Sequence, residues 1–129
     1  MEFTQIKETC LYVSDLDQSY AFYHDKLGLP LISKVPNRHV FFRLGTSVLL
    51  CFIAEATKGE KELPPHFASG KQHIAFEVAK DNYNETKEKF KVLGIEITHC
   101  QKWPGSYESF YLEDPDGHVL EIVPEGMWS

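Results

Sequence analysis

The chain has 129 residues, 43% of them hydrophobic and 13% aromatic, which is one domain's worth of sequence with enough apolar material for a real core. Its net charge of −6 disfavours a nucleic acid or an anionic membrane as partner, because both select basic patches. The composition therefore indicates a globular protein with a small-molecule ligand, no nucleic acid and no membrane.

The first half of the chain predicts a strand, a helix and three further strands. The run "TCLYV" is typical of a short strand, and "SDLDQSYAFYHDKLG" has apolar residues at helical spacing between the capping residues Ser14 and Asp15 and a stop at Gly28. Three β-type runs follow, which we expect to form a meander: "LPLISKV", "HVFFRL" and "SVLLCFIA".

The same order returns after a polar connection. The run "HIAFEV" predicts a strand, "KDNYNETKEKFKVLG" a helix, and "IEITHC", "YESFYLE" and "HVLEIV" three more strands. Val13 recurs as Val78 and Gly28 as Gly94 at nearly the same spacing. A repeat of this length is typical of a duplication.

The duplication defines the expected domain organisation. We expect one domain made of two βαβββ modules, about residues 5–54 and 72–124, joined by a loop over residues 55–71. Neither module has enough core to be stable alone, so the two must pack together, within one chain or between two chains.

Alternation along each strand divides its side chains between two faces. Apolar residues belong under the helix, so the open face of each first strand carries the others: Glu8, Cys10 and Tyr12 in one module, and His73, Ala75 and Glu77 in the other. In the fourth strands we expect Leu50 and Phe52 under the helix, which leaves Cys51 on the open face. By the same alternation Glu121 lies on the open face of the last strand.

Four of these side chains occupy matching positions in the two modules. Glu8 and His73 begin the first strands, and Cys51 and Glu121 lie in the middle of the last ones. A buried ionised carboxylate costs several kcal/mol unless it has a partner, so Glu121 inside an apolar strand indicates a cation. If the first and fourth strands lie close, two facing modules can surround one ion. The pattern predicts a duplicated metal-ligand geometry.

The stretches "ETCLYVSDLDQSYAFYHDKLGL", "HIAFEV" and "YESFYLEDPDGHVLEIV" resemble the vicinal oxygen chelate superfamily, which includes glyoxalase I, bleomycin and fosfomycin resistance proteins and extradiol dioxygenases. The resemblance covers both modules. It implies an α+β fold in which two tandem βαβββ modules form curved mixed sheets around a central cavity, the glyoxalase/bleomycin resistance/dioxygenase fold. Because the superfamily uses one scaffold for many reactions, the resemblance implies the fold more closely than the reaction.

In metal-dependent members of the superfamily the ligands resemble the positions described above. The resemblance implies Glu8, His73 and Glu121 as metal ligands, and it leaves open whether Cys51, in place of a usual Glu or Gln, is a fourth. Two carboxylates and one imidazole suit a divalent metal ion such as Zn, Ni, Mn, Fe or Co, with positions left for water or a bidentate substrate.

The leading hypothesis is a glyoxalase-type metalloenzyme of the lyase or isomerase class. A divalent metal would chelate two vicinal oxygens of a small substrate and stabilise an enediolate or alkoxide. Glu121 or Glu8 would act as the catalytic base. Five further side chains are candidates for substrate binding: Tyr12, Cys51, Glu77, Trp103 and Tyr107. The segments 55–71 and 102–107 are candidates for closing over the substrate.

Two alternatives remain open. One is a metal-free binding protein, like the bleomycin-resistance branch, in which Tyr12, Trp103, Tyr107 and Tyr111 stack on an aromatic ligand. The other is an extradiol-type dioxygenase, which is disfavoured because Glu8 does not supply the second His of its triad. Fosfomycin-type chemistry is also disfavoured, because the sequence reveals no cluster of Lys or Arg for a phosphonate.

The resemblance also implies assembly, since members of the superfamily often pair the first module of one chain with the second module of another. We therefore expect a homodimer with shared sites, in which Glu8 of one subunit joins His73 and Glu121 of its twin. Three cysteines at unpatterned spacing, no cleavable leader and no apolar run near the roughly 20 residues of a membrane span predict a cytoplasmic location. Four histidines have no partner that the sequence identifies: His24, His66, His99 and His118.

Overall fold

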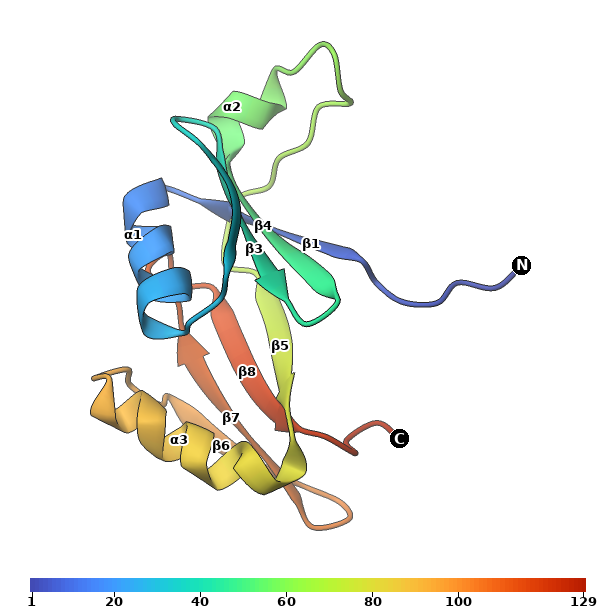
Figure 1. Ribbon diagram of the computed structural model, residues 1–129, viewed down its shortest axis with the longest axis vertical. Coiled ribbons are helices and arrows are strands. Elements are labelled where there is room, and N and C mark those ends of the chain that lie inside the picture. The colour runs from blue at the N-terminus through green and yellow to red at the C-terminus, as the bar shows by residue number, and fades with distance from the viewer. The chain divides into compact units, whose positions relative to one another are not determined.

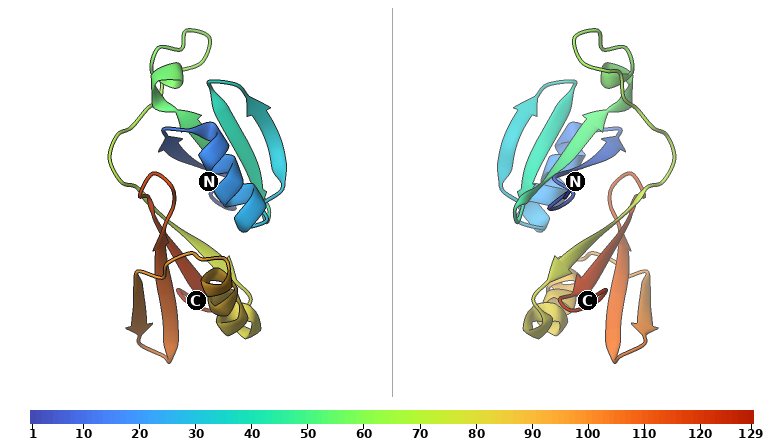
Figure 2. Two further views of the ribbon diagram at one scale, coloured as in Figure 1. Left: turned by 90° about the vertical axis from the view of Figure 1, so that its left-hand side faces the viewer. Right: turned by 90° about the vertical axis from the view of Figure 1, so that its right-hand side faces the viewer.

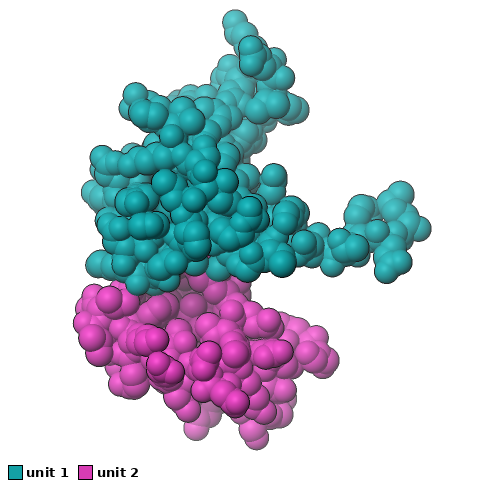
Figure 3. Space-filling model, in the orientation of Figure 1, with its two compact units in different colours: residues 1–70 teal, residues 71–129 magenta.

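The computed structural model describes residues 1–129 and divides into two compact units, residues 1–70 and residues 71–129 (Figure 3). Each unit contains one four-stranded mixed sheet with a helix along one face (Figures 1 and 2). The α+β fold with two βαβββ modules is thereby confirmed. No helix is long and apolar enough to cross a membrane.

Unit 1 has its strands in the order β1-β4-β3-β2, with β1 parallel to β4 and the other pairs antiparallel. Its elements are β1 (Glu8–Val13), α1 (Leu16–Tyr20), the π-helical segment η1 (Ala21–Lys26), β2 (Leu31–Val35), β3 (His39–Leu44), β4 (Ser47–Ile53) and α2 (Ala54–Lys58). The helix begins as expected at Asp15, whose carboxylate accepts the backbone N–H groups of Asp17 and Gln18 at 2.9 and 3.0 Å.

Unit 2 repeats this arrangement in the order β5-β8-β7-β6, with β5 parallel to β8. Its elements are β5 (His73–Val78), the short 3₁₀ segment η2 (Lys80–Asn82), α3 (Tyr83–Val92), β6 (His99–Trp103), β7 (Tyr107–Glu113) and β8 (Val119–Pro124). In both units the first strand lies at a sheet edge beside the fourth strand. In each unit this parallel pairing places the start of the first strand beside the start of the fourth strand.

Aromatic rings join each helix to its sheet. In unit 1, Tyr23 is fully buried with its ring centroid 5.7 Å from that of Phe42. In unit 2, Phe110 lies between Tyr83 and Phe90 of α3, with centroid distances of 5.6 and 5.5 Å. Burying a large apolar side chain of this kind contributes about 1.5–3 kcal/mol, so these contacts fix which face of each sheet is covered.

The expected faces of β4 are wrong. The register pairs Cys51 with Leu11 and Leu49 with Phe42, and paired residues point to the same face, so Cys51 lies on the helix-covered side. Its exposed fraction is 0%. Phe52 instead pairs with Tyr12 on the open face. Cys51 is therefore a core residue and is removed from the candidate substrate-binding residues.

Two expected loops and one expected strand also differ. The connection after β4 begins with the helix α2, and the strand expected over residues 95–100 begins only at His99. The segment 102–107 is a β-hairpin and not a lid, because Trp103 pairs with Tyr107 across a connection of residues 104–106. A hairpin closed by strand pairing on both sides has little freedom to fold over a ligand.

The corrected position of Cys51 can be tested with thiol chemistry. We expect a thiol reagent to modify exposed Cys100 in the folded protein while Cys51 stays unmodified until the protein unfolds, because its side chain has no solvent access. Mass spectrometry of peptides from briefly labelled protein would measure this. Equal labelling of the two residues would contradict the assigned face of β4.

Candidate metal site and the family of the chain

The open face of the unit 2 sheet is polar across its middle. The strand register aligns Ala75, Glu121, Tyr111 and His99 in one row across the four strands, with His73 and Ser109 in neighbouring rows. Phe110, Leu112, Leu120 and Ile122 point to the opposite face and are buried. The apolar face thus holds the helix, and the polar face is left for chemistry.

His73 and Glu121 are brought together on this face, as predicted. His73 Nε2 lies 3.3 Å from Glu121 Oε1, and His73 Nδ1 lies 2.8 Å from the carbonyl oxygen of Val119. Because a carbonyl oxygen only accepts, Nδ1 is the donor in that bond. A neutral His73 then turns the lone pair of Nε2 toward a carboxylate oxygen, and two acceptors at this distance need a proton or a metal cation between them.

Glu121 has a second partner in Tyr111. Burial first, and then the negative charge of Glu121 and a hydrogen bond to it, raise the pKa of the Tyr111 hydroxyl, so this group stays protonated and donates to the carboxylate. Ser109 hydrogen-bonds Tyr111 in turn and accepts the indole N–H of Trp103 at 2.9 Å. Polar side chains therefore follow one another across the open face from Trp103 to Glu121, which is only 7% exposed.

Glu8 lies in unit 1, exposed at the start of β1 and on its open face, where the sequence places it. Its role in a site shared with His73 and Glu121 stays a proposal. The residue that corresponds to Glu121 in the unit 1 sheet is Leu50 and not Cys51, because Glu8 pairs with Val48 as His73 pairs with Val119. Unit 1 thus has no side chain for a fourth ligand at that position.

The rest of the unit 1 open face is aromatic. Tyr12 stacks on Phe52 with centroids 6.2 Å apart, and the ring of His66 meets Phe52 edge-on at 4.6 Å. The ring of His39 stacks on Phe41 at 3.8 Å. These rings offer an apolar surface beside the strand that carries Glu8.

An ion pair between Arg38 and Glu60 connects residues 59–66 to the aromatic surface. Arg38 Nη2 lies 2.6 Å from Glu60 Oε1, and Arg38 Nη1 donates to Nδ1 of His39. His39 is 6% exposed, and burial, followed by the charge of Arg38, lowers its pKa. The connection predicted as a lid is thus anchored at Glu60.

Cys10, on the open face of unit 1, is not activated as a nucleophile. Burial, and then the charge of Glu8, raise the pKa of the Cys10 thiol, which favours the protonated form. Burial likewise raises the pKa of Tyr12. Both groups are therefore held in their protonated forms in the absence of a metal ion.

The other predicted binding residues lie at different places in unit 2. Glu77 is exposed on the open face of β5 and pairs with Val123. Tyr107 lies at the far end of β7, where the ammonium of Lys80 is 5.8 Å from its ring, and lines a cavity of about 260 Å³ near the start of α3. Trp103 joins the site only through Ser109.

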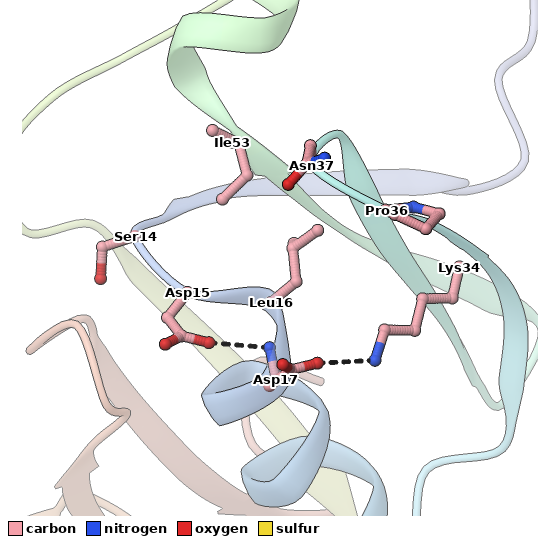
Figure 4. Close-up of a pocket in the computed structure, with 8 residues that line it drawn as sticks. All are labelled: Ser14, Asp15, Leu16, Asp17, Lys34, Pro36, Asn37 and Ile53. Carbon is pink, nitrogen blue, oxygen red and sulfur yellow. Dashed lines mark hydrogen bonds and ion pairs between the residues drawn. The ribbon is translucent and has the colours of Figure 1, made fainter.

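A cavity of about 550 Å³ lies in unit 1 beside the start of α1 (Figure 4). Its acidic side chains have structural partners: Asp15 caps the helix, and Asp17 binds the ammonium of Lys34 at 2.9 Å. Within either unit, no three His, Cys, Asp or Glu side chains gather closely enough to hold a metal ion. The His73 and Glu121 pair offers two potential metal ligands, and a metal ion held there would need a third from elsewhere.

Ser109 was missed from the sequence, and Tyr111 was expected only as a stacking residue. The signal was present in "YESFYLE", where Phe110 and Leu112 are apolar and alternate with Ser109 and Tyr111. Alternation alone could place both on the face of Glu121. Their hydrogen bonds required the strand register, which pairs Tyr111 with Glu121.

Known proteins similar to the chain include a glutathione transferase and two lactoylglutathione lyases. The glutathione transferase FosA of Serratia marcescens is 33% identical over 112 residues, which cover 87% of this chain and 74% of that protein. The lactoylglutathione lyase of Haemophilus influenzae is 31% identical over 129 residues, with 92% and 91% covered. The crystal structure of a lactoylglutathione lyase from Agrobacterium tumefaciens superimposes with a TM-score of 0.95 at 34% identity, covering 100% of this chain and 99% of that one.

Residues 5–122 match the family described as the glyoxalase/bleomycin resistance protein/dioxygenase superfamily. The match spans strands of both units, from β1 to β8. It agrees with the duplicated βαβββ topology and with the resemblance seen in the sequence. The chain therefore belongs to the glyoxalase/bleomycin resistance protein/dioxygenase superfamily.

Proposed function

We propose that the protein is a metal-dependent enzyme of the glyoxalase type, which binds a small substrate through two vicinal oxygens. The observation that carries this proposal is the meeting of His73 Nε2 and Glu121 Oε1 at 3.3 Å while His73 Nδ1 donates to Val119. A divalent cation satisfies both acceptors at once. The donor set fits such an ion, since imidazole and carboxylate together suit Zn, Ni, Mn, Fe or Co.

Each residue has a distinct role in this proposal. His73 and Glu121 would hold the metal, and Glu8 would be the third ligand. A bound divalent ion would supply Lewis-acid stabilisation of negative charge that develops on the substrate oxygens. The carboxylate of Glu121 or Glu8 would accept the proton from the substrate carbon. The Tyr111 hydroxyl would keep Glu121 oriented, because it donates to that carboxylate.

The aromatic open face of unit 1 supports binding of the less polar part of the substrate. Tyr12 would contribute to it, and Glu77 would meet a cationic or hydroxyl group on the face of unit 2. Trp103 would act through Ser109, and Tyr107 at its separate cavity would take part only with an extended substrate. The cytoplasmic location stays a prediction.

The metal proposal predicts the behaviour of a His73→Ala variant. We expect it to lose stoichiometric metal, because the remaining carboxylates form a poor transition-metal site, while its thermal unfolding stays close to that of the unmodified protein, since the His73 side chain is 51% exposed. Elemental analysis after purification without chelators, with titration calorimetry, measures this. His99→Ala, which changes another histidine on the same face, is the matched control. Metal retained by His73→Ala at full stoichiometry would contradict the assignment.

The shared-site homodimer is a second expectation of the proposal. If Glu8 of one subunit completes the site of its twin, mixing Glu8→Ala with His73→Ala protein under subunit exchange should restore metal binding in the heterodimer, because it contains one intact ligand set. Calorimetry on the mixture and light scattering on each parent measure this. A monomer in solution, or no recovery on mixing, would place all ligands within one chain.

A metal-dependent thiol transfer is the second candidate, and the 33% identity to a glutathione transferase favours it. The strands of the unit 2 sheet carry no Lys or Arg on the open face, so the phosphonate group of fosfomycin would have no cationic partner there.

We expect the metal-loaded enzyme to isomerise the hemithioacetal of methylglyoxal and glutathione faster than it adds glutathione to fosfomycin. Product analysis by mass spectrometry separates the two reactions, and a larger kcat/KM for the addition would reverse the ranking.

A further inference from the structure

His118 is a buried histidine that the candidate metal site does not include. It is 2% exposed and lies between the turn that follows β7 and the start of β8. Because it is buried, it cannot contact a ligand at the surface, and the proposed function assigns it no role. Its hydrogen bonds, however, lead toward His73.

The ring of His118 holds the residue before His73. The backbone N–H of Gln72 donates to Nδ1 of His118 at 3.0 Å, and the carbonyl oxygen of Gln72 accepts the N–H of Val119 at 2.8 Å. The next residue, His73, donates from its own Nδ1 to the carbonyl oxygen of Val119 at 2.8 Å. Residues 118 and 119 therefore fix both the backbone before His73 and the tautomer of its ring.

The position of His118 is itself fixed by a closed turn. Asp114 Oδ1 accepts the backbone N–H groups of Asp116 and His118, both at 2.9 Å, and the N–H of Asp114 donates to the carbonyl oxygen of His118 at 3.0 Å. Gly117 allows this turn because its φ of +81° lies in the left-handed region. Asp114 is only 6% exposed, so these bonds are shielded from water.

We propose that His118 is a positioning residue for the metal ligand His73, and that it acts by accepting the Gln72 amide at Nδ1. The inference rests on the proposed function, because it takes His73 as a ligand. The required tautomer carries its proton on Nε2, the opposite of His73, whose proton is on Nδ1. Partners that orient a ligand in this way tune metal affinity without touching the ion.

Two variants separate the hydrogen bond from the volume of the ring. His118→Leu fills the buried position with an apolar side chain and removes the hydrogen-bond acceptor. His118→Asn retains an acceptor oxygen at the place of Nδ1. We expect His118→Leu to raise the Kd for Co²⁺ about 10-fold, the lower end of the range for residues that orient a ligand. We expect His118→Asn to keep the Kd close to that of the unmodified protein. His24→Asn, a surface histidine of unit 1, is the control and should change neither value.

A measurement without metal distinguishes this inference from the proposed function. Nitrogen NMR of the apoprotein should find the Nδ1–H tautomer of His73 in the unmodified and His118→Asn proteins, and a mixture of tautomers with faster Gln72 amide exchange in His118→Leu. If the unmodified protein binds no Co²⁺, the proposed function fails, and the tautomer and amide exchange still decide the role of His118. The same His73 tautomer and the same Gln72 amide exchange rate in all three proteins would overturn the positioning role of His118. An equal Co²⁺ loss in both variants would also overturn it, because ring volume and not the acceptor would then matter.

Discussion

The hydrogen bond from His73 Nδ1 to the carbonyl oxygen of Val119 determines what the second sheet can do. It fixes a proton on Nδ1, so that in the neutral ring Nε2 is the acceptor and faces Glu121 at 3.3 Å. The bond exists because β5 and β8 pair in parallel with His73 opposite Val119. A slip of one residue in that register would turn Glu121 toward the helix, where an ionised carboxylate has no partner. The chemistry of the site therefore depends on strand register.

The two units share this register but differ in what they display. At the position of Glu121, unit 1 has Leu50, and around it lie the rings of Tyr12 and Phe52. The duplicated topology has thus been kept while the donor groups have not. If a metal ion is bound as we propose, so few protein ligands would leave coordination positions for a substrate, as in catalytic metal sites and unlike closed structural ones.

The sequence predicted the modules, the helices and the faces of β1 and β5, where apolar and polar residues alternate. It also predicted the faces of β8, where the single charged residue, Glu121, marks the open side of an otherwise apolar strand. It failed in β4, where Leu49 to Phe52 are all buried and alternation carries no information about the two faces. The pair of His73 and Glu121 was predictable from position and residue type. The bonds of Tyr111 and His118 were not, since each partner lies on another strand or turn and only the three-dimensional register reveals it.

The three histidines within strands show why residue type alone does not define a ligand. Arg38 donates to Nδ1 of His39, so the proton of the His39 ring is on Nε2, which donates to the Ser33 hydroxyl. His39 therefore cannot act as a base that accepts the proton of Ser33 as a nucleophile. In His99, Nε2 donates to the side-chain oxygen of Gln101 at 2.9 Å. In His73 the Nδ1–H donates to a backbone carbonyl, and Nε2 is the ring nitrogen that faces a carboxylate. Among these three histidines, His73 is the one whose ring nitrogen contacts a carboxylate, and its surrounding hydrogen bonds determine which nitrogen that is.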